Sequence, residues 1–83
     1  MQVKKRDGRL QEFDRDKLKN SFTVAGAGEE EAEKFTGQVE AWAQEAAVDN
    51  VIESQAIWEK VVEILEGVDE VAAERYKAYR GSL

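Results

Sequence analysis

The chain has 83 residues, 42% of them hydrophobic, which is enough for one domain with a modest core. It contains neither cysteine nor histidine, so disulfides, thiolate metal sites and the commonest general base are excluded. No apolar run approaches the roughly 20 residues of a membrane span, and the N-terminus lacks the apolar stretch of a signal peptide, so we expect a cytoplasmic protein.

Charge is distributed unevenly along the chain. Seven of the twelve lysines and arginines lie in the first 20 residues, whereas residues 21–83 hold fourteen of the eighteen acids. An acidic body repels duplex DNA, whose affinity for proteins depends on phosphate neutralisation, so we do not expect nucleic-acid binding. A small basic end suits a small anion, although a solvated charged hairpin would explain the same pattern.

A β-hairpin is predicted over residues 2–13, where two short extended runs flank an Asp-Gly pair. Two registers are possible. A two-residue turn would put Val3 and Phe13 on opposite faces, whereas a three-residue loop with Gly8 left-handed would put them on the same face. We prefer the second register because it gathers the apolar side chains against a core. Its inward face would carry Val3, Lys5, Gln11 and Phe13.

Four helices and one short strand are predicted after the hairpin. The helices span about 15–25, 29–47, 54–66 and 69–80, and the strand spans about 50–53. Asp14, Ser54 and Asp69 are expected to cap the first, third and fourth helices. The Gly-Ala-Gly segment is expected to end the first helix rather than to bind phosphate, because it follows a helix and not a strand.

The apolar residues of each helix recur at helical spacing and predict which face is buried. They are Leu18, Phe22 and Ala25; Ala32, Phe35, Val39, Trp42 and Ala46; Ile57, Val61, Ile64 and Leu65; and Val71, Ala72, Tyr76 and Tyr79. The order of elements predicts a mainly α fold of the α+β class, with residues 1–83 as a single domain. It would be a four-helix bundle capped by a small three-stranded sheet, which the hairpin and the short strand form together.

No set of residues typical of a catalytic site assembles in the sequence, so we expect a protein that is not an enzyme. The informative place is the junction of the hairpin with the first helix. Lys5 and Gln11 share the inward face, and Lys17 lies one turn into the helix, beside backbone N–H groups expected to be free. Ammonium groups and helix N–H donors together form a ready phosphate site.

Four more residues could complete a nucleotide site at this junction. Val3 and Leu18 offer apolar walls to a flat base. Ser54 and Trp58 lie one turn apart at the start of the third helix, where the hydroxyl could donate a hydrogen bond and the indole could cover a ring. Alternatively, Ser54 is only a cap and Trp58 only a core residue. Helical spacing places Trp58 at the edge of its apolar stripe and Trp42 at the centre of another.

Two patterns in the sequence resemble a known family. The first is Val3-x-Lys5-Arg6-Asp7-Gly8 followed by Phe13-Asp14-x-x-Lys17-Leu18, and the second is Ser54-x-x-Ile57 with Val61, Val71-Ala72, Tyr76 and Tyr79-Arg80. Together they resemble the ATP-cone domain, a regulatory domain of ribonucleotide reductases and of a bacterial repressor of their genes. The resemblance covers nearly the whole chain.

The resemblance implies that ATP or dATP, together with Mg²⁺, binds between the sheet and the first and third helices. It implies apolar walls from Val3 and Leu18, phosphate contacts from Lys5, Arg6 and Lys17, polar contacts from Gln11, Asp14 and Ser54, and stacking of adenine on Trp58. Family members often have an acid where Gln11 stands and a histidine where Trp58 stands, so the preference between ATP and dATP stays open.

The function implied by the resemblance is nucleotide sensing. Binding would control the association or activity of a partner such as a ribonucleotide reductase, or the association of a second copy of the chain. The alternative is a small helical protein-interaction domain that has lost nucleotide binding.

Overall fold

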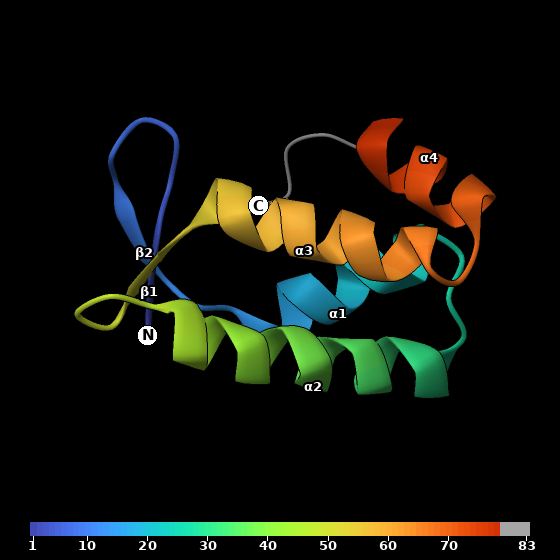
Figure 1. Ribbon diagram of the computed structural model, residues 1–83, viewed down its shortest axis with the longest axis horizontal. Coiled ribbons are helices and arrows are strands. Elements are labelled where there is room, and N and C mark those ends of the chain that lie inside the picture. The colour runs from blue at the N-terminus through green and yellow to red at the C-terminus, as the bar shows by residue number, and fades with distance from the viewer. Residues whose placement is uncertain (79–83) are drawn as a thin grey trace.

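The computed structural model describes residues 1–78 of the chain. Its elements follow the expected order of hairpin, two helices, strand and two helices (Figure 1). They are β1 (Gln2–Lys4), β2 (Leu10–Glu12), α1 (Arg15–Val24), α2 (Glu29–Ala46), β3 (Val51–Glu53), α3 (Ser54–Glu66) and α4 (Glu70–Ala78). The α+β fold with four helices and a three-stranded sheet is therefore confirmed. The expected end of the last helix, with Tyr79 and Arg80, lies outside the described residues.

The sheet has the strand order β2-β1-β3, with β1 antiparallel to β2 and parallel to β3. Val3 lies opposite Gln11, and the Lys5 N–H donates to the Arg9 carbonyl at 2.8 Å. Three residues remain in the turn, and among them Gly8 has a φ of +89°, a left-handed conformation that glycine adopts without strain. The three-residue loop, with Val3 and Gln11 on one face, is therefore confirmed.

A tight left-handed turn leads from α2 into β3. Asp49 and Asn50 have φ values of 53° and 63°. The Asn50 carbonyl accepts a hydrogen bond from the Gln2 N–H at 2.8 Å, which ties the turn to β1. Because Asn50 is left-handed, the strand begins at Val51 and not at the expected residue 50.

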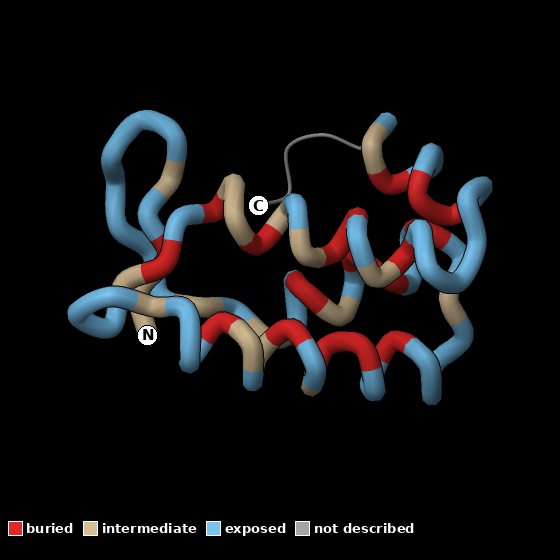
Figure 2. The backbone as a smooth tube through the Cα atoms, viewed as in Figure 1, coloured by how far each residue is buried: buried red, intermediate tan, exposed pale blue. Residues whose placement is uncertain are grey.

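The core lies between the helices, under the sheet. Figure 2 shows buried residues on the side of α2 that faces the other helices, and exposed residues on its outer side. α1 packs mainly against α2, and α3 packs mainly against α4. Phe22 of α1 is fully buried, and its ring centroid lies 5.4 Å from that of Phe35 on α2. The aromatic pair joins the first two helices at the centre of the fold.

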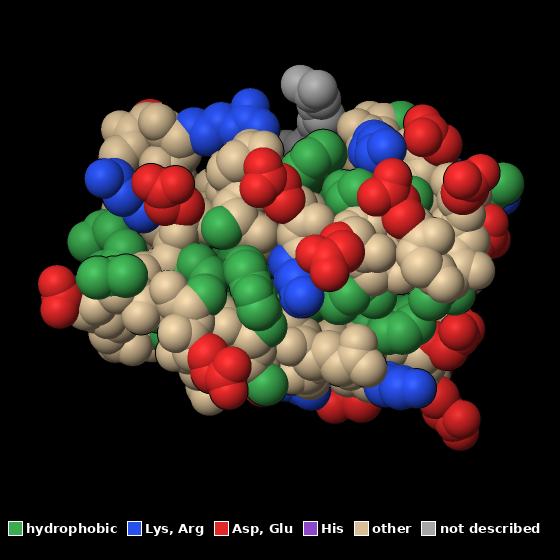
Figure 3. All heavy atoms as spheres, in the orientation of Figure 1, with side chains coloured by type: hydrophobic (Ala, Val, Ile, Leu, Met, Phe, Trp, Pro, Cys, Tyr) green, Lys and Arg blue, Asp and Glu red, His purple; other side chains and the backbone are tan. Residues whose placement is uncertain are grey.

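The expected buried stripe of α2 is wrong in its second half. Trp42 is only half-buried and Ala46 is exposed, whereas Ala43 is completely buried. After Val39, the next side chain that points inward is four residues further along the helix. That residue is Ala43, whereas Trp42 is only three residues away. The Trp42 ring instead lies near the surface under the Lys60 ammonium, 5.6 Å from Nζ. Hydrophobic side chains gather on this face of the molecule, where α2 and α3 lie (Figure 3).

The stripes of the last two helices also differ from expectation by one position each. On α3, Val62 is buried and Ile64 is only half-buried. On α4, Val71 is 57% exposed, and Ala73 takes the inward place instead. In both helices the inward face is rotated slightly from the one that the apolar residues alone predict, because each helix packs against its neighbours and not against a flat surface.

Two of the three expected helix caps are confirmed. The Asp14 carboxylate accepts from the Lys17 N–H at 3.1 Å, and the Asp69 carboxylate accepts from the Val71 N–H at 2.9 Å. Ser54 is not a cap. It is the first residue of α3 and is 7% exposed, because β3 leads directly into the helix and Glu53 takes the capping position.

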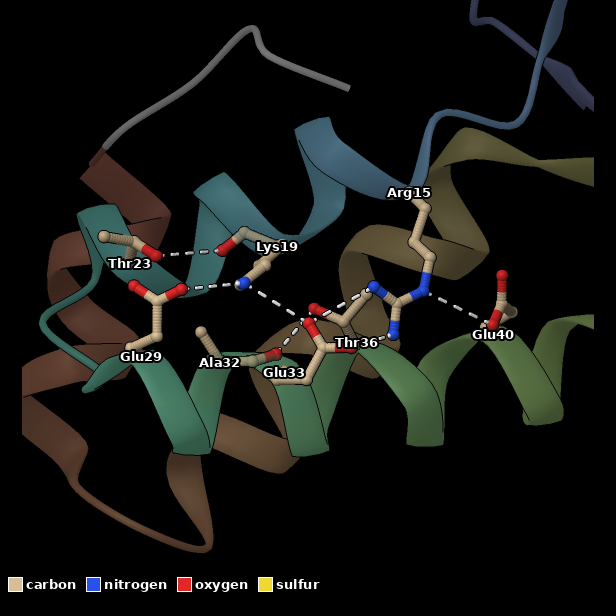
Figure 4. Close-up of polar contacts among 8 residues, drawn as sticks. All are labelled: Arg15, Lys19, Thr23, Glu29, Ala32, Glu33, Thr36 and Glu40. Carbon is tan, nitrogen blue, oxygen red and sulfur yellow. Dashed lines mark hydrogen bonds and ion pairs between the residues drawn. The ribbon is translucent and has the colours of Figure 1, made fainter.

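A ladder of ion pairs, formed by Arg15 and Lys19 with Glu29, Glu33 and Glu40, fastens α1 to α2 (Figure 4). Arg15 reaches Glu33 at 2.6 Å and Glu40 at 3.6 Å. Lys19 reaches Glu29 at 3.1 Å and Glu33 at 3.3 Å. Glu33 is thus shared by both cations. The ladder occupies the face of α1 that lies toward α2.

The burial of Phe22 and the partial exposure of Trp42 predict different costs of truncation. Phe22→Ala should lower the free energy of unfolding by about 3–5 kcal/mol, as large-to-small changes in a core do. Trp42→Ala should cost about 1–2 kcal/mol, because its burial is partial and an exposed cation–π contact adds little. Urea denaturation of the two variants measures both values, and a larger loss for Trp42→Ala would contradict the packing described here.

The ladder also predicts how stability depends on acid. Hydrogen bonds from Arg15 and then Lys19 lower the pKa of Glu33 in the folded state, against the opposing effect of burial. A lowered folded-state pKa gives stability that is present above the unfolded value, about 4.3 for glutamate, and is lost as the pH falls through the folded value. Thermal melts from pH 6 to pH 3 should therefore fall less steeply for Glu33→Gln than for the wild type.

The control for this experiment is Glu59→Gln, an exposed position on α3 outside the ladder. It should follow the wild-type slope. An identical slope for Glu33→Gln and the wild type would show that the ladder does not contribute to folding stability.

Candidate functional site

A hollow lies where the inner face of the sheet meets the starts of α1 and α3. About 400 Å³ of space lies in this hollow, a figure that includes space open to solvent. Four segments of the chain form it: β1 with the residue after it, β2 with the junction to α1, the first turn of α1, and the first turn of α3. The described lining consists of Val3, Lys5, Gln11, Glu12, Phe13, Asp14, Lys17, Leu18, Ser54 and Ile57.

Apolar side chains form the floor of the hollow. Val3, Leu18 and Ile57 are 9%, 1% and 2% exposed and belong to the hydrophobic core. Phe13 is half-buried and packs against that core. They come from the sheet and from both helices, so a flat apolar group would contact all three elements at once.

Two ammonium groups face the same hollow. Burial lowers the pKa of Lys5 below its usual value, and the positive charges of Lys17 and then Arg9 lower it further, whereas Asp7 acts in the opposite direction. Both lysines belong to the lining, so the positive charge of each lies close to the other. An anion between them would relieve this repulsion, because charge-assisted hydrogen bonds to an anion favour the protonated amine.

The start of α1 offers less to an anion than the sequence suggests. The Lys17 N–H, expected to be free, already donates to the Asp14 carboxylate. That carboxylate also brings a negative charge to the mouth of the hollow, since Asp14 belongs to the lining. Recognition of phosphate in this hollow therefore depends on lysine side chains more than on helix N–H groups.

Seven of the nine candidate residues are brought together in the hollow, and Arg6 and Trp58 are not among the lining. The Arg6 guanidinium donates to the Gln55 side chain of α3 at 2.8 Å. The Trp58 ring packs against Tyr76 of α4, with centroids 6.2 Å apart. Ile57 lines the hollow in place of Trp58, because the two neighbours on α3 point in directions about 100° apart.

Three lining residues were missed by sequence reasoning as site residues: Glu12, Phe13 and Ile57. Phe13 could have been found, because the preferred hairpin register already placed it on the inward face with Gln11. Ile57 lies three residues after Ser54, on the same side of a helix. No feature of the sequence pointed to Glu12 as a site residue, because alternation along β2 puts it on the face opposite Gln11. It pairs with the Gln2 side chain, and its carboxylate lies 3.9 Å from the N-terminal amine.

Within residues 1–78, no group of three or more acidic side chains is arranged to hold a metal ion. None of the helices in that part of the chain is long and apolar enough to cross a membrane.

Comparison with known proteins identifies the family. Residues 1–82 match the family model described as the ATP cone domain, whereas comparison with curated protein sequences gave no match. Domains of this family are regulatory rather than catalytic, and they bind ATP or dATP. The match covers essentially the whole chain and agrees with the bundle, the three-stranded cap and the hollow between them. The chain therefore belongs to the ATP cone domain family.

Proposed function

We propose that the chain is a single nucleotide-sensing domain that binds ATP or dATP in the hollow between the sheet and the starts of α1 and α3. One observation carries the proposal: two lysines, Lys5 and Lys17, line a hollow whose floor is apolar. A nucleotide has the matching parts, because its phosphates are anionic and its base is flat and largely apolar. A simple inorganic anion would leave the apolar floor unused.

The phosphates would lie toward the two lysines. Lys5 reaches them from the end of β1, and Lys17 from the first turn of α1. Arg6 adjoins Lys5 and can add a third cation if its guanidinium leaves Gln55, which holds it only by a neutral acceptor. The rest of the chain is mostly acidic, so three cations at this end of the molecule would attract a polyphosphate here.

The base would lie over the apolar floor formed by Val3, Leu18 and Ile57. Polar side chains of the lining, Gln11, Asp14 and Ser54, would supply hydrogen bonds to the base edge or the ribose. Trp58 has no place in this arrangement, because its ring lies against Tyr76.

Mg²⁺ fits the site only as a companion of the phosphates. Glu12 and Asp14 are the two carboxylates among the described lining, and protein-bound Mg²⁺ commonly uses one or two carboxylates together with phosphate oxygens. The ion would neutralise phosphate charge there.

We infer that binding controls a partner, such as a ribonucleotide reductase, or the association of a second copy of the chain. A nucleotide can do so only through a difference in its affinity for two association states. The rival function, an interaction domain that has lost nucleotide binding, predicts no response to nucleotide. The cytoplasmic location stays a prediction.

Thermal melts with and without ATP and MgCl₂ distinguish the two functions. A nucleotide-binding domain gains about 2.7 kcal/mol when ATP is present at a hundred times its dissociation constant. The midpoint should therefore rise as ATP or dATP is raised into the millimolar range, and it should keep rising with concentration. An unchanged midpoint for both nucleotides would reject the proposal and favour the interaction domain.

Substitution of the lysines tests where the nucleotide binds. Lys5→Ala and Lys17→Ala should each weaken ATP binding by about 1–3 kcal/mol, because each removes a charge-assisted hydrogen bond to phosphate. Isothermal titration measures the loss. Lys34→Ala is the matched control, since Lys34 is exposed on α2 and outside the described lining. Equal losses in all three variants would mean that general electrostatic attraction, and not the hollow, holds the nucleotide.

A further inference from the structure

A hydrogen bond joins the turn of the hairpin to the start of α3, beside the hollow. The Arg6 guanidinium donates to the Gln55 side-chain oxygen at 2.8 Å. Each partner directly follows a residue of the lining, because Lys5 precedes Arg6 and Ser54 precedes Gln55. The pair therefore marks the edge of the hollow on the side of the turn.

The partner of Arg6 is neutral, and this distinguishes Arg6 from the other arginine of the hairpin. Arg9 is held by the Asp7 carboxylate at 2.7 Å. Among residues 1–78, the partner of the Arg6 guanidinium is the Gln55 amide and not a carboxylate. The bond to Gln55 thus holds the guanidinium in place and leaves its positive charge unneutralised.

The backbone of the turn is fixed by hydrogen bonds that do not involve the Arg6 side chain. The Gly8 N–H donates to the Lys5 carbonyl at 2.9 Å, and the Lys5 N–H donates to the Arg9 carbonyl at 2.8 Å. The Arg9 N–H also donates to the Asp7 carboxylate at 3.1 Å. Arg6 itself is exposed. Its side chain can therefore change partner while the turn and the core stay as they are.

The order of residues along the first strand matches the order of the parts of a nucleotide. Val3 belongs to the apolar floor, and Lys5 follows it by two residues, or about 7 Å of extended chain. Arg6 comes next, outside the described lining. A base over Val3, with its phosphates directed toward the turn, would meet Lys5 first and Arg6 last. A short phosphate chain would end at the lysines, whereas a longer one would reach Arg6.

We propose that Arg6 and Gln55 together make the hollow selective for a nucleoside triphosphate over a diphosphate. The terminal phosphate takes the Arg6 guanidinium from Gln55, because phosphate accepts two parallel hydrogen bonds and neutralises the charge, whereas the amide offers one neutral oxygen. A diphosphate ends at the lysines and leaves the bond to Gln55 in place. The inference rests on the proposed function and adds the number of phosphates that the site distinguishes.

Isothermal titration of the 83-residue chain with ATP and with ADP, each with MgCl₂, tests the selectivity. The wild type should bind ATP at least about tenfold more tightly than ADP, as one additional charge-assisted hydrogen bond allows. Arg6→Ala should lower this ratio below about threefold, by weakening the binding of ATP and not of ADP.

Arg9→Ala is the matched control, because Arg9 is an exposed arginine of the same hairpin and is already neutralised by Asp7. It should keep the wild-type ratio. Equal losses of ATP and ADP affinity in Arg6→Ala would overturn the proposal. Absence of ATP binding to the wild type would instead reject the proposed function, so the two failures are distinguishable.

Substitution of Gln55 tests the exchange of partners. Gln55→Glu supplies a carboxylate that should hold Arg6 as Asp7 holds Arg9, so the ratio should fall as it does in Arg6→Ala. The same substitution made in Arg6→Ala corrects for general repulsion of phosphate, and there it should change the ratio by less than about twofold. A wild-type ratio in Gln55→Glu would overturn the role of Gln55.

Gln55→Ala removes the competing acceptor and should strengthen ATP binding by about two- to threefold, since a weak hydrogen bond no longer has to be broken. Weaker ATP binding in Gln55→Ala would show that Gln55 orients Arg6 toward the phosphate, which would overturn the exchange. Thermal melts without nucleotide confirm that each variant is folded.

NMR signals of the Gln55 side-chain amide supply an independent readout. Saturating ATP should move them to the positions seen in nucleotide-free Arg6→Ala, because in both cases the amide oxygen has lost the guanidinium. Saturating ADP should leave them at the positions of the nucleotide-free wild type. Equal movement with ADP and with ATP would overturn the proposal.

Discussion

The parallel pairing of β1 with β3 is the constraint on which the site depends. It joins residues 2–4 to residues 51–53 and so brings the first segment of the chain to the point where α3 begins. The same strand pairs on its other edge with β2, which leads into α1. Since β1 is central in the sheet, both walls of the hollow are positioned by a strand of 3 residues. Without this pairing the hairpin would have no fixed place over the helices, and isolated hairpins are marginal in water.

α1 shows how a short helix can serve two surfaces with alternating cations. Arg15 and Lys19 are four residues apart and point toward α2, where three glutamates hold them. Lys17 lies between them in sequence and turns to the hollow instead. The separation follows from helical geometry, since a step of two residues rotates a side chain by about 200°. The acids of α2 thus neutralise Arg15 and Lys19 on one face of α1. The positive charge of Lys17, on the other face, stays directed toward the hollow.

Sequence reasoning succeeded where local chemistry decides the structure. The hairpin register followed from Gly8 and from the need to gather Val3 and Phe13, and the cap of α1 followed from Asp14. It failed where tertiary packing decides. Trp42 has the spacing of a core residue, yet Ala43 lies inside, because the inward face of α2 continues from Val39 by a step of four residues. Trp58 was expected to cover a base, and its direction depends on where α4 packs, which no local pattern in α3 encodes.

The turn at residues 6–8 has a consequence for how such a domain can diverge. The pairing of Val3 with Gln11 directs Gln11 and Phe13 to the face of the sheet that Val3 occupies. A slip of one residue in this pairing would leave the composition unchanged but would direct Leu10 and Glu12 to that face instead. A point substitution alters one contact at a time, whereas such a slip would exchange an entire wall. Changes in this turn that allow β2 to slip are therefore a route by which this scaffold would lose the lining of the hollow in one step.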